Sequence, residues 1–272
     1  MKSSRGILLS VLLVPLACLV ALPFYYIVVN TLKTQPETAA QPLALPTSLY
    51  LDNYIEVFRD IPVLQSFLNT LYVTVLSIAI MLLIGSMAAF GVLIGRGRLA
   101  SIVGVILVIA FVVPGQATLV PLYRMLAGVE LVDSLNGLVV MYACGSIFCY
   151  FLIIGYMRSL PTELFEAARI DGAGPFRVYW SIALPLIRPI LVTVGVFQTM
   201  WVWNDFITPN VFINSPQKQT LVLQVYTAVG EFTTNWPVFM TLTVIALIPM
   251  VVFFVFAQRQ IVSGLVNGSV KG

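Results

Sequence analysis

Long apolar stretches without charge follow one another along the chain, separated by short groups of charged and turn-forming residues. A helix needs about 20 mainly apolar residues to cross a bilayer, so each stretch of about this length is a candidate span. The pattern predicts an all-α polytopic membrane protein with six transmembrane helices. The candidates are Ile7–Val29, part of Val63–Gly95, Leu99–Tyr123, Ser134–Met157, Pro189–Asn204 and about Pro237–Ala257.

Composition supports a membrane protein over a soluble or disordered one. Of the 272 residues, 60% are hydrophobic and 9% are charged, whereas soluble domains have about 25% charged residues. The mean hydropathy of +1.00 also excludes a disordered chain, since disorder requires low hydrophobicity. The net charge of +3 is too small to indicate nucleic-acid binding.

Several kinds of chemistry are missing from the sequence. Histidine is absent, which excludes histidine-based zinc sites and catalytic triads. No glycine precedes Lys2, Lys33, Lys218 or Lys271, so no Walker A phosphate loop is present. We therefore expect a non-catalytic chain that binds no cofactor and no metal.

Basic residues predict the orientation, because lysine and arginine accumulate in short cytoplasmic loops. If the N-terminus is cytoplasmic, only Lys33, Arg59, Arg124 and Lys218 among the 14 basic residues fall outside. Both termini are then cytoplasmic. We expect an N-terminal helix and external loop over 1–62, a core with five spans over 63–262 and a cytoplasmic tail over 263–272. In the external loop, Tyr54, Val57 and Phe58 have the spacing of a short amphipathic helix.

The longest predicted cytoplasmic connection, 158–188, exceeds what a turn between two spans requires. Pro161 suits a first helical turn, and the acidic residues that follow favour a helix N-terminus. Leu160, Leu164, Ala167 and Ala168 would share one face. Gly172 and Pro175 should then end this helix before a second one, Phe176–Leu184. The segment is either an interfacial connector or a docking element for a cytoplasmic partner.

The residues of this segment decide between those two interpretations. Glu166-Ala167-Ala168, Asp171-Gly172-Ala173 and Leu184-Pro185 resemble, in type and spacing, the EAA loop of bacterial ABC importer permeases. Tyr179 stands where that family usually has phenylalanine. Asp52-Asn53-Tyr54, Val113-Pro114-Gly115-Gln116, Trp203-Asn204-Asp205 and the tail ending in Val-Lys-Gly extend the resemblance to the carbohydrate-uptake permeases, similar to the smaller membrane subunit of the maltose transporter.

The resemblance implies a heteromeric complex in the bacterial inner membrane. Its partners would be a second permease, a dimer of cytoplasmic ABC ATPases that use ATP and Mg, and an external solute-binding protein. The EAA helix would sit in a cleft of the ATPase, where Glu166 pairs with a basic or amide group and Asp171 braces the turn. The implied coupling residues are Glu163, Glu166, Ala167, Ala168, Asp171, Gly172, Ala173, Leu184 and Pro185. Val270, Lys271 and Gly272 either contact the ATPase or form a frayed end.

Amide residues in the spans, together with Trp203 and Asp205 at the end of the fifth span, are candidates for the substrate pathway, since polar groups inside a membrane often mark one. These are Asn69, Gln116, Gln198, Trp203, Asn204 and Asp205. The amides equally suit hydrogen bonds between helices, and the tryptophan and Asp205 equally suit an interfacial belt and a helix cap. By analogy with the family, Glu231 and Asn235 would face the binding protein.

The expected function is therefore ATP-driven import of a sugar or oligosaccharide by alternating access. An alternative keeps the ABC permease and changes the cargo to a glycerol phosphodiester or a polyol. An ion-coupled secondary transporter is less consistent with the sequence, because such proteins normally carry ionisable groups within their spans.

Overall fold

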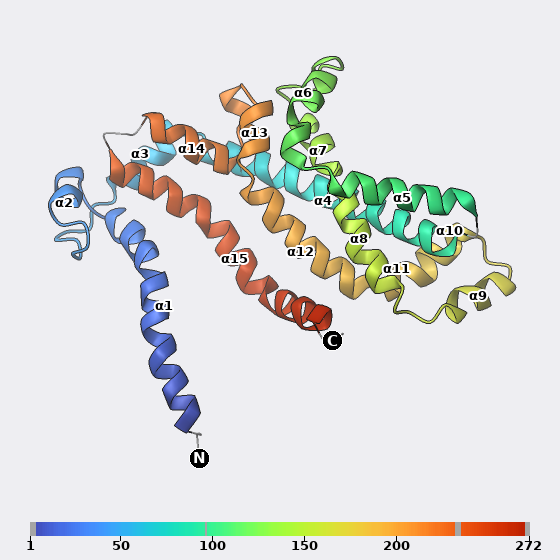
Figure 1. Ribbon diagram of the computed structural model, residues 1–272. Coiled ribbons are helices and arrows are strands. Elements are labelled where there is room, and N and C mark those ends of the chain that lie inside the picture. Colours follow the sequence, from blue (N-terminus) through green and yellow to red (C-terminus); the bar gives the residue numbers. More distant parts are fainter. Residues whose placement is uncertain (1–3, 96, 232–234, 270–272) are drawn as a thin grey trace. The chain divides into compact units, whose positions relative to one another are not determined.

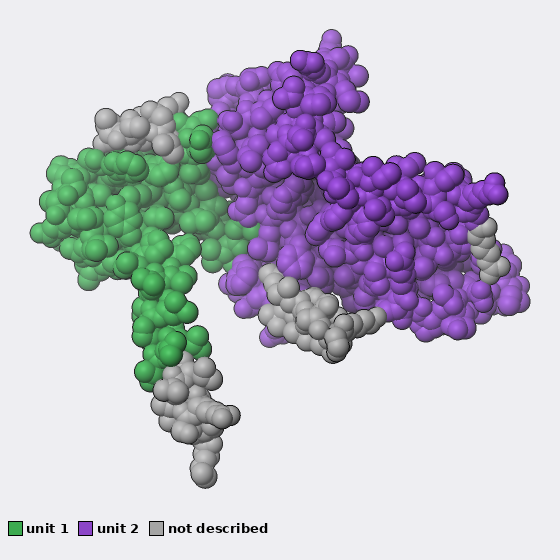
Figure 2. All heavy atoms as spheres, viewed as in Figure 1, with its two compact units in different colours: residues 1–64, 224–251 green, residues 65–223, 252–272 purple. Residues whose placement is uncertain are grey.

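The computed structural model describes residues 4–95, 97–231 and 235–269, and this part of the chain is mainly helical and contains no β-strand. It divides into two compact units, coloured separately in Figure 2. Unit 1 comprises residues 1–64 and 224–251, and unit 2 comprises residues 65–223 and 252–272. The domain boundaries expected from the sequence stay a prediction.

The helices follow one another with short connections (Figure 1). The longer ones are α1 (Ser4–Asn30), α4 (Val63–Ile94), α5 (Arg98–Val112), α8 (Ser146–Met157), α12 (Arg188–Asn204), α14 (Leu221–Glu231) and α15 (Trp236–Ser269). The shorter ones are α2 (Gln35–Ala40), α3 (Asp52–Asp60), η1 (Gly115–Thr118), α6 (Leu119–Ala127), α7 (Leu135–Ala143), α9 (Glu163–Ile170), α10 (Pro175–Val178), η2 (Tyr179–Ala183, a π-turn), α11 (Leu184–Leu186), α13 (Ile207–Phe212) and η3 (Pro216–Lys218).

Four stretches of the described chain are long and apolar enough to cross a membrane, or up to six if each of two bent helix pairs is one span. One bent pair corrects the continuous span expected over Leu99–Tyr123. The helix stops at Val112 and resumes at Gly115 with a bend of 94°. Pro114 lies in the gap, where its missing N–H and the restriction it places on Val113 oppose an unbroken helix.

Within unit 1, the segment between α1 and α4 folds over a buried lysine. Lys33 is fully buried, and its ammonium donates a hydrogen bond of 2.8 Å to the carbonyl of Gln41. The amide of Asn53 on α3 donates to the carbonyls of Thr31 and Lys33. The amphipathic helix expected here is present, with Val57 fully buried and Phe58 exposed.

Unit 2 contains the hydrophobic core, in which α4, α8 and α12 pack closely. A Cβ at Gly85 of α4 would lie only 2.6 Å from the Cβ of Cys149 on α8, so this crossing requires glycine. Gly145, just before α8, is equally confined by Met81 and Gln198. The close approach holds α4 as a fixed support for the segment that follows α8.

Candidate functional site

The segment after α8 forms the short helix and tight turn that the sequence predicts. The carbonyl of Thr162 accepts hydrogen bonds from the amides of Phe165 and Glu166, at 3.0 and 3.1 Å, which starts α9. At the other end Gly172 has φ +80°, and the amide of Ala173 donates back to the carbonyl of Ala168. This left-handed residue closes the helix as a glycine-based C-cap.

Two aromatic side chains fasten this segment to α4. Phe165 of α9 is 3% exposed, and its ring meets the ring of Phe90 edge-on at 6.3 Å. Tyr179 is also buried, with its ring 5.4 Å from that of Phe90. Its hydroxyl is 2.8 Å from the hydroxyl of Ser86. The end of α4 therefore holds α9 and the π-turn together.

The exposed surface of α9 carries both apolar side chains and the charged side chains of Glu163, Glu166 and Arg169. Leu164 is 44% exposed and Ile170 is 86% exposed, and Ala167 and Glu166 lie on the surface as well. The sequence grouped Leu164, Ala167 and Ala168 on one face, but the residues actually buried are Phe165 and Ala168. The spacing of these two residues by three was a signal that sequence analysis missed.

The remaining coupling candidates lie around this helix. Glu163 is in the first turn of α9 and is exposed. Asp171 is the C-cap residue, and its carboxylate makes no hydrogen bond with another residue that the structure describes. Leu184 and Pro185 lie in α11, immediately before a bend of 74° into α12. The segment thus leads directly into a candidate span.

Asn69 and Gln198 are both buried and hydrogen-bonded within unit 2. The amide of Asn69 donates to the carbonyls of Gln217 and Gln219, at 2.9 and 3.0 Å. The amide of Gln198 contacts the sulfur of Met81 and the carbonyl of Gly145. These bonds fit the alternative in which polar residues join helices, and a role in the substrate pathway stays a prediction.

Asp205 lies where α12 ends, and the other pathway candidates differ in whether they are buried or exposed. Its carboxylate accepts hydrogen bonds from the Tyr142 hydroxyl at 2.9 Å and from the Ile207 amide at the start of α13. Trp203 is 6% exposed and packs edge-on against Phe67. Asn204 is exposed, as is Gln116 in η1. The structure therefore does not gather these six candidates into one cavity.

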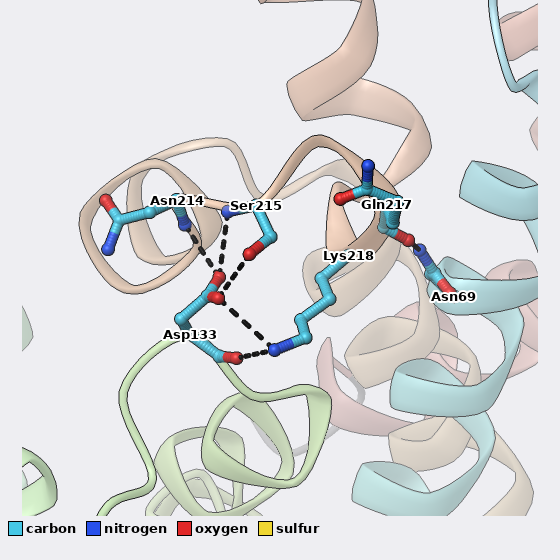
Figure 3. A network of polar contacts seen from close by, with 6 residues as sticks. All are labelled: Asn69, Asp133, Asn214, Ser215, Gln217 and Lys218. Carbon is cyan, nitrogen blue, oxygen red and sulfur yellow. Dashed lines mark hydrogen bonds and ion pairs between the residues drawn. The ribbon is translucent and has the colours of Figure 1, made fainter.

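A polar cluster that sequence analysis missed joins the loop before α7 to the loop after α13 (Figure 3). The carboxylate of Asp133 accepts hydrogen bonds from the amides of Asn214 and Ser215, both at 2.9 Å, and from the Ser215 hydroxyl. Lys218 donates to the Asp133 carbonyl at 2.6 Å and to its carboxylate at 3.2 Å. We call these four residues the Asp133 clamp.

Electrostatics of the Asp133 clamp favour the charged carboxylate. Partial burial by itself raises the pKa of Asp133, but the hydrogen bonds from Ser215, Asn214 and Lys218 outweigh it. The pKa therefore lies well below its ordinary value. Because Asp133 lies 81 to 85 positions before the other three residues in the sequence, no local pattern could have paired them.

Some of the predicted site residues lie outside the part of the chain that the structure describes. Val270, Lys271 and Gly272 lie outside the described residues, as does the side chain of Glu231. Asn235 is partly exposed just before α15, where its carbonyl accepts a hydrogen bond from Phe239. The described residues contain no group of three His, Cys, Asp or Glu that could hold a metal ion.

Known proteins match this chain over nearly its whole length. The chain is 37% identical to the probable starch degradation products transport system permease protein AmyC of Thermoanaerobacterium thermosulfurigenes, over 97% of this chain and 96% of that protein. It is 31% identical to the melibiose/raffinose/stachyose import permease protein MelC of Bacillus subtilis, over 100% and 98%.

Solved structures show the same fold. A crystal structure of a bacterial ABC transporter involved in the import of the acidic polysaccharide alginate matches with a TM-score of 0.81, at 24% identity, over 95% of this chain and 98% of that one. The family model described as binding-protein-dependent transport system inner membrane component matches residues 4–266. The chain is therefore a membrane protein that belongs to the family of inner membrane components of binding-protein-dependent transport systems.

Proposed function

We propose that this chain is a permease subunit of an ATP-driven importer that carries a sugar or oligosaccharide into a bacterial cell. Relatives named for starch degradation products, for melibiose, raffinose and stachyose, and for arabinooligosaccharides support this cargo. In this proposal the chain crosses the inner membrane six times and keeps both termini in the cytoplasm. A second permease, an ABC ATPase dimer and an external solute-binding protein complete the complex.

The single observation that carries the proposal is the construction of α9. Its inner face is held to α4 by Phe165, while its outer face presents Leu164, Ala167 and Ile170 with no covering element among the described residues. A short helix that is rigidly supported on one side and exposes both apolar and charged side chains on the other is suited to contact a partner. The ATPase is the partner that we assign to it.

Coupling follows from how the segment is connected. A push on α9 reaches α4 through Phe90 and reaches α12 through the π-turn and α11. Closure of the ATPase dimer around ATP and Mg would therefore shift helices of the core and alternate access to the substrate pathway. Hydrolysis takes place on the ATPase, and this chain supplies the joint.

The test uses the full complex with its ATPase, its second permease and its binding protein. Glu166→Lys reverses a charge on the exposed side of α9, and reversal at an interface costs ~2 kcal/mol or more. We expect binding-protein-stimulated ATP hydrolysis and uptake to fall about tenfold or more, with the protein still inserted in the membrane. Arg259→Gln, an exposed change on α15 away from α9 in the sequence, is the control. Normal uptake by Glu166→Lys would exclude the proposed joint.

The cargo has its own measurement. Ligand binding by the cognate solute-binding protein, followed by uptake of the bound compound by the complete transporter, identifies the solute. We expect an oligosaccharide to be bound and taken up. Uptake of a glycerol phosphodiester or a polyol without any sugar would replace the proposed cargo and leave the permease role intact.

A further inference from the structure

A groove with mostly apolar walls lies between α4, α5 and α8 in unit 2, and its lining includes Val92 of α4 and Gly95 just after that helix. Its volume is about 520 Å³. Val105, Val108 and Ile109 of α5 contribute apolar side chains to its wall. None of the 15 residues of α5 is buried, so the groove has an open side, and its walls suit a hydrocarbon chain better than water.

Polar groups are confined to particular points of this groove. Arg158 lines it at the end of α8, and Ser101 lines it in the first turn of α5. No aspartate or glutamate is among its lining residues in the described chain. A groove lined by a guanidinium and a hydroxyl and by no carboxylate is suited to bind a phosphate.

Tyr150 contributes a hydroxyl to the same groove, near Gly104. Tyr150 is 4% exposed and lines the groove, yet its hydroxyl makes no hydrogen bond with another residue that the structure describes. This hydroxyl lies 3.8 Å from the Cβ position of Gly104. Gly104 follows Ser101 by three residues, which is about 4.5 Å of helix rise. A hydroxyl on the wall of an apolar groove can donate a hydrogen bond to an acceptor on a ligand.

We infer that this groove binds an anionic glycerophospholipid of the cytoplasmic leaflet. Its phosphate contacts Arg158 and Ser101, an ester carbonyl accepts the hydrogen bond of Tyr150, and an acyl chain lies along α5. The absence of a Cβ at Gly104 leaves room for that chain. Basic sites between helices at the cytoplasmic surface are a recognised form of lipid binding. The leaflet assignment rests on the orientation in the proposed function.

The consequence concerns the proposed joint, because Arg158 is the first residue of the 158–188 segment. A lipid held by Arg158 and by α5 joins the start of that segment to the neighbouring helix. Through Arg158, the lipid composition of the membrane influences the segment that carries α9, although the bound lipid does not contact α9 itself.

The experiment measures lipid retention, which does not depend on transport. The full complex is delipidated in detergent and titrated with phosphatidylglycerol or with phosphatidylcholine, and bound lipid is counted by native mass spectrometry. We expect phosphatidylglycerol to bind more tightly. Arg158→Gln should weaken it about fivefold, since one basic residue near an anionic surface contributes about that factor. Tyr150→Phe removes only the hydroxyl. It should weaken the binding of both lipids about fivefold.

Two further variants separate the site from general effects. Gly104→Leu places a side chain in the groove and should abolish the tight phosphatidylglycerol binding. Arg259→Gln makes the same charge change at an exposed position outside the groove and should leave it unchanged. Equal retention by Arg158→Gln and Arg259→Gln would overturn the inference.

A cross-link decides whether protein fills the groove instead. Val105→Cys with a photoreactive probe should label lipid, and labelling of the second permease there would overturn the inference. Retained lipid binding in a complex that fails to take up any sugar would count against the proposed cargo alone.

Discussion

The Asp133 clamp and the α9 segment are both connections between helices, but they are fastened by opposite means. The clamp is closed by charged and polar groups that satisfy one another, with Asp133 accepting from Ser215, Asn214 and Lys218. The α9 segment is fastened by rings packed under it and leaves apolar side chains on its surface. A connection that is satisfied internally serves the chain itself, whereas a supported but uncovered one serves a partner.

Among changes to these two connections, removal of the Phe165 ring beneath α9 should destabilise the structure most. Phe165→Ala deletes a buried side chain, and such changes cost about 3–5 kcal/mol. We expect α9 to detach from α4 and its cleavage by protease to accelerate. Phe176→Ala is the matched control, because Phe176 is 72% exposed in the same segment. Similar protease sensitivity of the two variants would show that Phe165 does not anchor α9.

The turn after α9 tests backbone conformation alone. Gly172 has φ +80° and no atom within 4 Å of its Cβ position, so Gly172→Ala meets no clash and only the cost of a left-handed backbone. That cost is about 1–2 kcal/mol. Gly174→Ala is the control, since Gly174 has φ −67° and equal space. Amide exchange in α9 should rise for the first variant, and equal exchange in both would refute the assigned turn.

Acid should weaken the clamp. Because the folded pKa of Asp133 lies below its ordinary value of about 3.9, its contribution is complete above that pH and is lost as the pH falls below it. Asp133→Asn should cost about 1–2 kcal/mol at pH 7, allowing for its partial exposure. Thermal unfolding of both proteins at pH 7 and pH 3 measures this. An undiminished difference at pH 3 would contradict the account of the clamp.

The smallest effect is expected at the hydroxyl pair that supplements the rings. Tyr179→Phe keeps the ring against Phe90 and removes one hydrogen bond to Ser86, for about 0.5–1.5 kcal/mol. A double-mutant cycle with Ser86→Ala isolates the pair. A coupling energy near zero would mean that packing alone holds the π-turn.

Local chemistry made part of this structure predictable. The acidic residues of the first turn and Gly172 mark the start and the end of α9 in the local sequence. The sequence therefore predicts where this helix ends. The break at Pro114 was missed, because the apolar run continues across it and length alone favoured one span. The bent pair shows that hydropathy identifies apolar stretches without showing whether one helix spans them.

Contacts between distant residues were beyond the sequence. Phe165 is separated from Phe90 by 75 positions, and Asp133 from Lys218 by 85, so neither pairing leaves a periodic signal. Asn69 illustrates the same limit, because a polar residue in an apolar stretch suggests a pathway equally well as a helix bond. Only the structure shows that the Asn69 amide donates hydrogen bonds to the carbonyls of Gln217 and Gln219, which favours the structural role.

The most direct test of the central claim places a cross-linker on the uncovered face of α9. Ala167→Cys in the complete transporter, with a short thiol-reactive cross-linker, should capture the ATPase and abolish uptake in proportion to the cross-linked fraction. Leu45→Cys, exposed in the segment between α2 and α3, should capture none. Capture of the ATPase at Ala167 with full uptake, or its absence while the complex remains assembled, would contradict the assignment of α9 as the joint.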